Sequence, residues 1–176
     1  MPNWVFNGLT IEGNPEQVKS LITQMNKPFV YSITPVGDLA YDVKQTKYVN
    51  PIFAFHNIYS YKDAGITDEQ YHSQPPHNPD TTMKDWFKFE TNDWYNFNVR
   101  EWGTKWDVGA DGQRNEIVGN TFNASFESAW GPPIQAYEKL EEMGFTVSAY
   151  YYEPGMSFCG VFSEGVDDYF DIGDMS

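Results

Sequence analysis

The stretch 121–162 constrains the fold more than any other part of this sequence, because three hydrophobic patterns follow one another in it. In TFNASFESAW (121–130), apolar and polar residues alternate, as they do in a half-buried strand. In IQAYEKLEEMG (134–144), the apolar residues recur at helical spacing and a glycine stands at the end of the helix. FTVSAYYY (145–152) alternates again. The sequence therefore predicts a strand, a helix and a strand in this order.

Turn and cap residues extend the pattern in both directions. Pro154 and Gly155 precede the apolar run SFCGVF and predict a hairpin closed by a type II turn. At the other end of the chain, WVFNGLTIEG (4–13) predicts a strand that is covered on both faces near its start. Asn14 and Pro15 then have the features of an N-cap and a first helical residue, before an apolar stripe at helical spacing.

The middle of the chain is less regular. PIFAFHNIY (51–59) is rich in β-branched and aromatic residues and predicts a second strand. The prolines of 60–82 indicate an irregular insertion, and 83–102 predicts an aromatic helix with Thr91 as a possible cap. The whole order fits a ferredoxin-like α+β fold, an antiparallel sheet with helices packed on one face and an elaborated middle insertion. We expect one such domain over 1–176.

The composition excludes several classes of protein. Aromatic residues make up 18% of the chain, which is too much apolar surface for a disordered protein. The formal net charge of -14 disfavours direct binding to DNA, RNA or anionic lipid and favours a basic partner. No run approaches the roughly 18–20 apolar residues of a membrane span, and the first residues lack the features of a signal peptide. We therefore expect a cytoplasmic protein.

Four stretches, PNWVFNGLTIEG, WGTKWD, FESAWGPP and YYEPGMSFCG, resemble the YubB-like, Api-type proteins of phages and conjugative plasmids. They span both ends and the centre of the chain, and they contain the motif residues Trp4, Trp102, Gly103, Trp106, Trp130, Pro154 and Gly155. The sequence departs from the family pattern at Val5 and Cys159, both core-sized changes. The resemblance implies a ferredoxin-like domain that originates in a mobile genetic element and acts in the cytoplasm of a bacterial host. It transfers no catalytic residue.

The acidic C-terminal segment, 163–176, is the main candidate binding site. It lacks lysine and arginine, and its candidate partner-binding residues are Glu164, Asp167, Asp168, Tyr169, Phe170, Asp171 and Asp174. One interpretation is a solvated acidic tail. The other is a surface that occupies the basic groove of a host protein and is anchored by the aromatic rings. An excess of 14 negative charges corresponds to roughly 24 Å of duplex DNA, so the surface could mimic DNA if these charges lie on one face.

The motif REWGTKWD (100–107) has two interpretations. Its tryptophans could stack on nucleobases or sugars, or they could form a corner packed on the sheet, where Gly103 lets the chain turn. We favour the corner, with Lys105 and Asp107 directed outward or paired locally.

Catalytic and metal-binding interpretations have less support. The titratable residues that could carry such chemistry are His56, His72, His77, Asp80, Glu101 and Asp107. A zinc site needs three or four convergent ligands, which a proline-rich loop does not hold in place. A carboxylate pair beside tryptophans could be a glycosidase pair, but such pairs arise by chance in a chain this rich in both. We expect no metal, no cofactor and no enzymatic activity.

The function that we predict is a non-catalytic protein of phage or mobile-element origin that binds and inhibits a host factor through an acidic surface. The expected partner is a host protein with a basic surface, such as a nucleic-acid-binding defence complex, which would make the chain an anti-CRISPR or other anti-defence inhibitor. Two alternatives stay open. A nucleotide- or small-ligand-binding protein would need Arg100, Lys105 or Arg114 to converge on an aromatic pocket. An enzyme acting on nucleic acid or sugar would show turnover.

Overall fold

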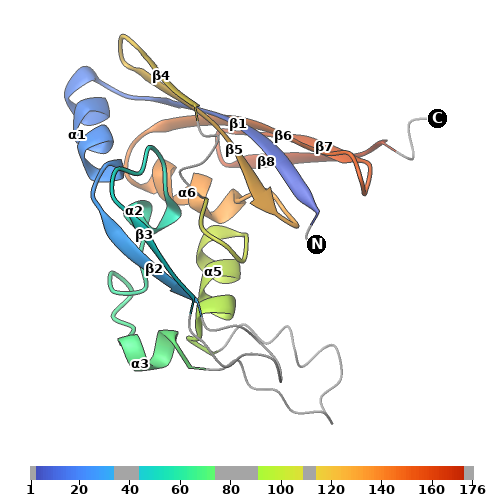
Figure 1. The fold of residues 1–176 in the computed structure, drawn as a ribbon. Coiled ribbons are helices and arrows are strands. Elements are labelled where there is room, and N and C mark those ends of the chain that lie inside the picture. The colour runs from blue at the N-terminus through green and yellow to red at the C-terminus, as the bar shows by residue number, and fades with distance from the viewer. Residues whose placement is uncertain (1–2, 34–43, 74–90, 109–113, 173–176) are drawn as a thin grey trace.

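The computed structural model describes residues 3–33, 44–73, 91–108 and 114–172. Its elements, in chain order, are β1 (Trp4–Glu12), α1 (Pro15–Met25), β2 (Phe29–Ile33), β3 (Lys44–Tyr48), α2 (Phe55–Ile58), α3 (Asp68–Tyr71), α5 (Trp94–Trp102), β4 (Arg114–Val118), β5 (Thr121–Ala129), α6 (Ile134–Glu142), β6 (Thr146–Glu153), β7 (Phe158–Ser163) and β8 (Val166–Asp171). Six strands form one antiparallel sheet in the order β4-β5-β1-β6-β7-β8, and β2 pairs with β3 in a separate two-stranded sheet. Figure 1 shows α1, α5 and α6 on the same side of the large sheet.

The connections of the large sheet are those of a ferredoxin-like fold. β1 lies between β5 and β6 and is antiparallel to both, so β5, α6 and β6 form a split β-α-β unit around it. Apart from the elements between α1 and β4, the chain runs β1, α1, β4, β5, α6, β6, which is the order β-α-β-β-α-β. β4 pairs with β5, and β7 and β8 extend the sheet beyond β6. The predicted fold class is confirmed.

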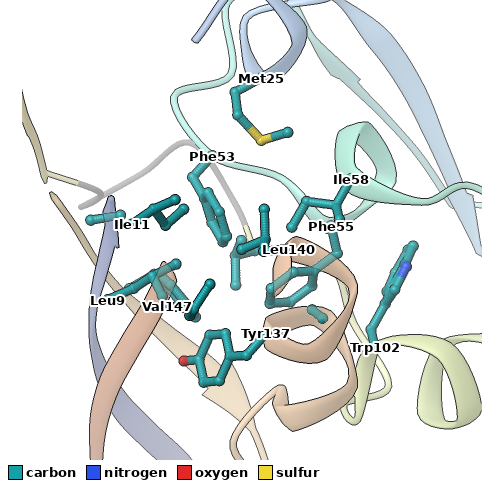
Figure 2. Packing of buried hydrophobic residues seen from close by; sticks show 14 of the residues in the cluster. Leu9, Ile11, Met25, Phe53, Phe55, Ile58, Trp102, Tyr137, Leu140 and Val147 are labelled. Atoms are coloured by element: carbon teal, nitrogen blue, oxygen red, sulfur yellow. The ribbon is translucent and has the colours of Figure 1, made fainter. Parts of the chain in front are cut away.

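The main core lies between the sheet and its helices. Leu9, Ile11 and Val147 project from the sheet toward Tyr137 and Leu140 of α6, as Figure 2 shows, and all five side chains are buried. Because alternate residues of a strand point to opposite faces, the apolar positions that the sequence pattern marked on β5 and β6 face this layer. The prediction that β1 is covered on both faces near its start is wrong, because Trp4 and Phe6 lie on the opposite face and are 41% and 47% exposed.

Local sequence signals predicted the two main helices correctly. Asn14 caps α1 through a capping box in which its side chain accepts from the Gln17 N–H at 2.9 Å and the Gln17 side chain accepts from the Asn14 N–H. α6 ends before Gly144, whose φ of 93° is the left-handed conformation that closes helices. α5 is confirmed over Trp94–Trp102, but its N-cap is Asp93, and Thr91 instead donates its hydroxyl to that carboxylate at 2.6 Å.

The predicted strand at 51–59 is wrong. The segment contains the short helix α2, and its apolar residues Phe53, Phe55 and Ile58 are buried against the core. A short run of buried aromatic residues fits the pattern of a helix and that of a strand equally well. Here the helix is favoured because the Asp107 carboxylate accepts its first N–H groups. The second strand of the ferredoxin-like unit is β4 instead, so the insertion between α1 and β4 is larger than the predicted 60–82 and also contains β2, β3, α3 and α5.

The C-terminal hairpin is confirmed, but its turn is not of type II. Such a turn requires a positive φ at Gly155, whereas the positive φ in this turn is the 59° of Ser157. Glu153, which is buried, accepts the N–H groups of Gly155 and Met156 and so fixes the turn. Beyond β7, the segment expected to be an acidic tail or surface forms β8 up to Asp171.

Candidate functional site on the helix-free face of the sheet

The face of the large sheet opposite the helices carries exposed apolar side chains. We call this face the open face. Its apolar residues come from four strands and are 41% to 64% exposed; they are Trp4, Phe6, Tyr150, Tyr152, Val161, Val166 and Phe170. Single exposed apolar residues are ordinary, but a contiguous patch of them marks a binding surface.

Strand register makes this patch continuous. Phe6, Tyr152, Cys159 and Phe170 stand opposite one another on four adjacent strands, and the rings of Phe6 and Tyr152 stack at a centroid distance of 6.4 Å. In the adjacent row, the ring of Tyr150 lies over the backbone of Gly8. A Cβ atom on that glycine would lie 2.3 Å from the Tyr150 ring. The glycine therefore allows the ring to lie flat across the sheet.

Carboxylates border the apolar patch of the open face. Strands β1, β5, β6, β7 and β8 contain no lysine or arginine. The strand alternation places Glu12, Glu127 and Asp168 on the open face at the borders of the apolar patch, and all three are exposed. A flat apolar centre with carboxylates at its border is complementary to a partner whose contact surface is edged by lysine or arginine.

The structure separates the predicted partner-binding residues of the C-terminal segment. β8 is an edge strand, so its side chains alternate between the two faces: Asp168 and Phe170 lie on the open face, and Asp167, Tyr169 and Asp171 lie on the helix-bearing side. Glu164 lies in the preceding turn with a φ of 52°, and Asp174 is outside the described residues. Their role in binding stays a prediction, but they do not form one acidic face.

Two of the residues on the helix-bearing side have internal contacts. Asp167 accepts the hydroxyl of Tyr151 at 2.7 Å, and the ring of Tyr169 packs on Phe158 at a centroid distance of 5.4 Å. Tyr151 and Phe158 belong to the small second core of the sheet. These contacts attach β8 to the rest of the fold.

The motif at 100–107 forms the predicted packed corner at Trp102 and Gly103, whereas its second tryptophan, Trp106, is half-buried. Trp102 is 1% exposed and its indole N–H donates to the Tyr59 carbonyl at 2.8 Å. Gly103 has a φ of 87°, and a Cβ there would lie 3.0 Å from the backbone nitrogen of Ile134. Both conditions require glycine. Thr104 then donates to the Ala129 carbonyl at 2.9 Å, which joins the corner to the end of β5.

Three other tryptophans of the family motifs gather beside this corner with Lys105. Its ammonium lies 4.2 Å from the ring centroid of Trp106 and 5.3 Å from that of Trp130. Trp4 is 6.0 Å from Trp106, between centroids. We call Trp4, Trp106 and Trp130 the tryptophan cluster. Burial beside these rings lowers the pKa of Lys105. Arg100 instead contacts Glu101, Thr91 and Asn92, so the two bases do not converge.

Of the two arrangements predicted for Asp107, directed outward or paired locally, the outward one is wrong. It is buried and accepts the backbone N–H groups of Phe55, His56 and Val108 at 2.8, 3.0 and 2.8 Å. Burial raises the pKa of its carboxyl to about 7, despite these three hydrogen bonds. Glu101 contacts Arg100 and Lys139. Both carboxylates of the proposed glycosidase pair therefore have internal structural partners.

A buried polar network continues from Asp107. The backbone N–H of Asp107 donates to the Tyr31 hydroxyl at 3.4 Å, and Asn98 donates to the same hydroxyl at 3.1 Å. Tyr71 donates its hydroxyl to the Asn98 side chain at 2.9 Å. The network ties the two-stranded sheet and α3 to α5, and its members are less than 10% exposed. We interpret it as structural.

The histidines are the candidate metal ligands of the sequence. Across the part of the chain that the structure describes, no three side chains of His, Cys, Asp or Glu gather to hold a metal ion. The ring of His56 stacks on Phe29 at 4.3 Å, and His77 and Asp80 lie outside that part. In the same described residues, none of the helices has the length and apolarity needed to cross a membrane.

Sequence reasoning missed the open face. The signal was present in FTVSAYYY, where the side of the strand that should be polar ends in two tyrosines, Tyr150 and Tyr152. Two large rings at outward positions of a strand need an explanation. The position of Phe6 beside them became evident only with the pairing of β1 and β6.

These features define an α+β protein of the ferredoxin-like class with an open, aromatic, acid-bordered sheet face. No family model matches the chain, and no curated protein matches its sequence. Among solved structures, the crystal structure of a protein Api92 from Yersinia pseudotuberculosis, of the family DUF1281, is similar over 97% of this chain and 98% of that chain. The identity is 11% and the TM-score 0.47. It is a distant structural neighbour.

Proposed function

We propose that this chain is a non-catalytic protein of phage or mobile-element origin that acts in the bacterial cytoplasm by binding a host protein through the open face. The proposed host partner is a basic, nucleic-acid-binding protein of a defence system, which the chain inhibits. Asp168, the acidic residue of β8 on the same side, takes part at the border of the contact.

The open face is the observation that carries the proposal. Six strands about 4.8 Å apart and up to about eight residues long, at roughly 3.3 Å per residue, give a flat area on the order of 600–800 Å². One side of a standard protein interface buries about 800 Å². The face is therefore large enough for one specific contact, and its aromatic residues are of the type that contributes most to binding energy.

Charge decides which kind of partner fits. Glu127 borders the patch beside Phe6, and Asp168 borders it beside Val161. Phosphate groups at these two positions would meet carboxylates, which disfavours nucleic acid as the ligand of this part of the face, even though exposed aromatic residues on a sheet are suited to stacking bases. A protein with lysine or arginine around an apolar centre avoids this repulsion.

The test is affinity capture from a bacterial lysate with matched variants. Tyr150→Ser/Tyr152→Ser removes two central rings of the open face, and Val30→Ser/Val49→Ser is the control, because these residues are 53% and 58% exposed and lie outside the large sheet. We expect the wild type and the control to retain the same basic protein. We expect the tyrosine variant to lose it, and we expect retention to weaken as salt increases.

Folding is checked by circular dichroism, since all four residues are exposed and their replacement should leave the melting curve nearly unchanged. Equal retention of the basic protein by the tyrosine variant would contradict the assignment of the open face. A captured partner that is acidic, or retention that is independent of salt, would contradict the charge argument.

A further inference from the structure

The tryptophan cluster lies at one end of the open face, where β1 starts and β5 ends. Trp4 is two residues before Phe6 on the same face of β1. Trp130 directly follows β5, and its backbone N–H donates to the Asn3 carbonyl at 2.9 Å. Trp4 and Trp130 are 41% and 50% exposed. The cluster is thus continuous with the surface that we propose for partner binding.

The rings already hold a cation. Lys105 places its ammonium within 6 Å of the centroids of Trp106 and Trp130, the range in which a ring face attracts positive charge. The corner at Gly103 and the Thr104 hydrogen bond to Ala129 bring Lys105 to this position. The geometry of a cation site is therefore present, with a side chain of the same protein in it.

Trp130 has an unusual backbone. Its φ of 71° lies in the left-handed region, which costs a bulky residue roughly 1–2 kcal/mol and is disfavoured without a compensating interaction. Half of this side chain is exposed, so burial compensates only part of that cost. The ring of Trp130 contacts the ammonium of Lys105.

We infer that the tryptophan cluster is a binding site for a cationic side chain of the partner, an arginine above all, and that Lys105 occupies this site until the partner displaces it. A guanidinium stacks on indole rings and is less strongly hydrated than an ammonium, so it competes well for the site. Displaced Lys105 returns to water, where its charge is fully hydrated. This inference rests on the proposed function, because it names the partner chemistry at one end of the same surface.

The test is a titration that needs no partner protein. N-acetyl-arginine amide is added to the protein while the indole N–H signals are followed by nuclear magnetic resonance, and N-acetyl-citrulline amide, the neutral isostere, is the control probe. Lys105→Met removes the ammonium from the site and keeps most of the length of the side chain. We expect saturable shifts of the Trp106 and Trp130 signals at concentrations about three- to fivefold lower in Lys105→Met than in wild type.

Trp102, which is buried in the core, serves as the internal reference and should not shift. Trp130→Ala in the Lys105→Met background should abolish the saturable change. Equal shifts with citrulline, equal affinities of wild type and Lys105→Met, or binding that persists without Trp130 would each overturn the inference. Because lysate capture tests the tyrosines and this titration tests the tryptophans, either experiment can fail while the other succeeds.

Discussion

Asp107 and His56 are expected to give the free energy of unfolding opposite dependences on pH. Burial raises the pKa of Asp107 from 3.8 to about 7, so the folded protein keeps a proton there that the unfolded chain has lost. The stability that this protonation contributes is complete below pH 3.8 and is lost as the pH rises through 7. Burial lowers the pKa of His56 from 6.5 to about 4, so its contribution to stability is instead complete above pH 6.5 and is lost as the pH falls to 4.

The magnitudes follow from about 1.36 kcal/mol for each pH unit that separates the folded and unfolded pKa. Between pH 5.0 and 7.5, Asp107 removes about 2.5 kcal/mol of stability, and His56 adds about 2 kcal/mol. The two contributions nearly cancel in the wild type. Asp107→Asn should therefore become more stable by about 2 kcal/mol from pH 5.0 to 7.5, and His56→Phe, which keeps a ring on Phe29, should become less stable by about 2.5 kcal/mol.

Urea unfolding followed by tryptophan fluorescence at several pH values between 5.0 and 7.5 measures these slopes, and each variant is compared with its own value at pH 5.0. Asp107→Asn also loses acceptors for backbone N–H groups, which lowers its stability at every pH and leaves the slope as the diagnostic quantity. The double variant should show neither contribution. If Asp107→Asn has the same pH slope as the wild type, the carboxyl is ionised throughout and the argument from burial is refuted.

Three further predictions concern stability and use melting or urea curves. Gly103→Ala should cost at least 2 kcal/mol, because the φ of Gly103 is left-handed and the added Cβ would contact the backbone of Ile134. Gly119→Ala, with a φ of 64° and open space around it, should cost only about 1 kcal/mol, and equal costs would contradict the packing of the corner. Asp167→Ala should destabilise by about 1–2 kcal/mol through the lost tyrosine hydrogen bond, whereas Asp168→Ala, one residue further along the strand, should cost less than about 0.5 kcal/mol. A larger loss for Asp168→Ala than for Asp167→Ala would contradict the assignment of these two side chains to opposite faces of the sheet. Trp106→Ala should cost about 1–2 kcal/mol, below the 3–5 kcal/mol of a fully buried tryptophan, since its ring is half-buried; a larger loss would mean that the ring belongs to the core.

Local patterns predicted the elements whose burial follows a single period. The alternation in 121–130 and 145–152, the N-cap at Asn14 and the glycine at 144 each depend on residues adjacent in sequence, and each is confirmed. The segment 51–59 shows where this reasoning fails. Phe53, Phe55 and Ile58 are all buried, so no periodicity distinguishes helix from strand, and a carboxylate 52 residues away accepts the first N–H of the helix.

The candidate site depended on pairing between distant segments. Phe6 and Tyr152 are far apart in sequence and stack because β1 and β6 are neighbours in the sheet. The acidic residues of 166–171 are consecutive or nearly so, yet strand alternation sends them to opposite faces, which a linear count of charges does not show.

The sequence by itself determined the fold class, the two main helices, the acidic character and the packed corner at Trp102 and Gly103, because these follow from local periodicity, capping, turn chemistry and composition. Only the tertiary structure decided which strand completes the ferredoxin-like unit, that Asp107 is buried, and that aromatic rings from four strands form one surface. Strand order and register set these contacts, and they depend on the free energy of the whole packed layer rather than on any one segment.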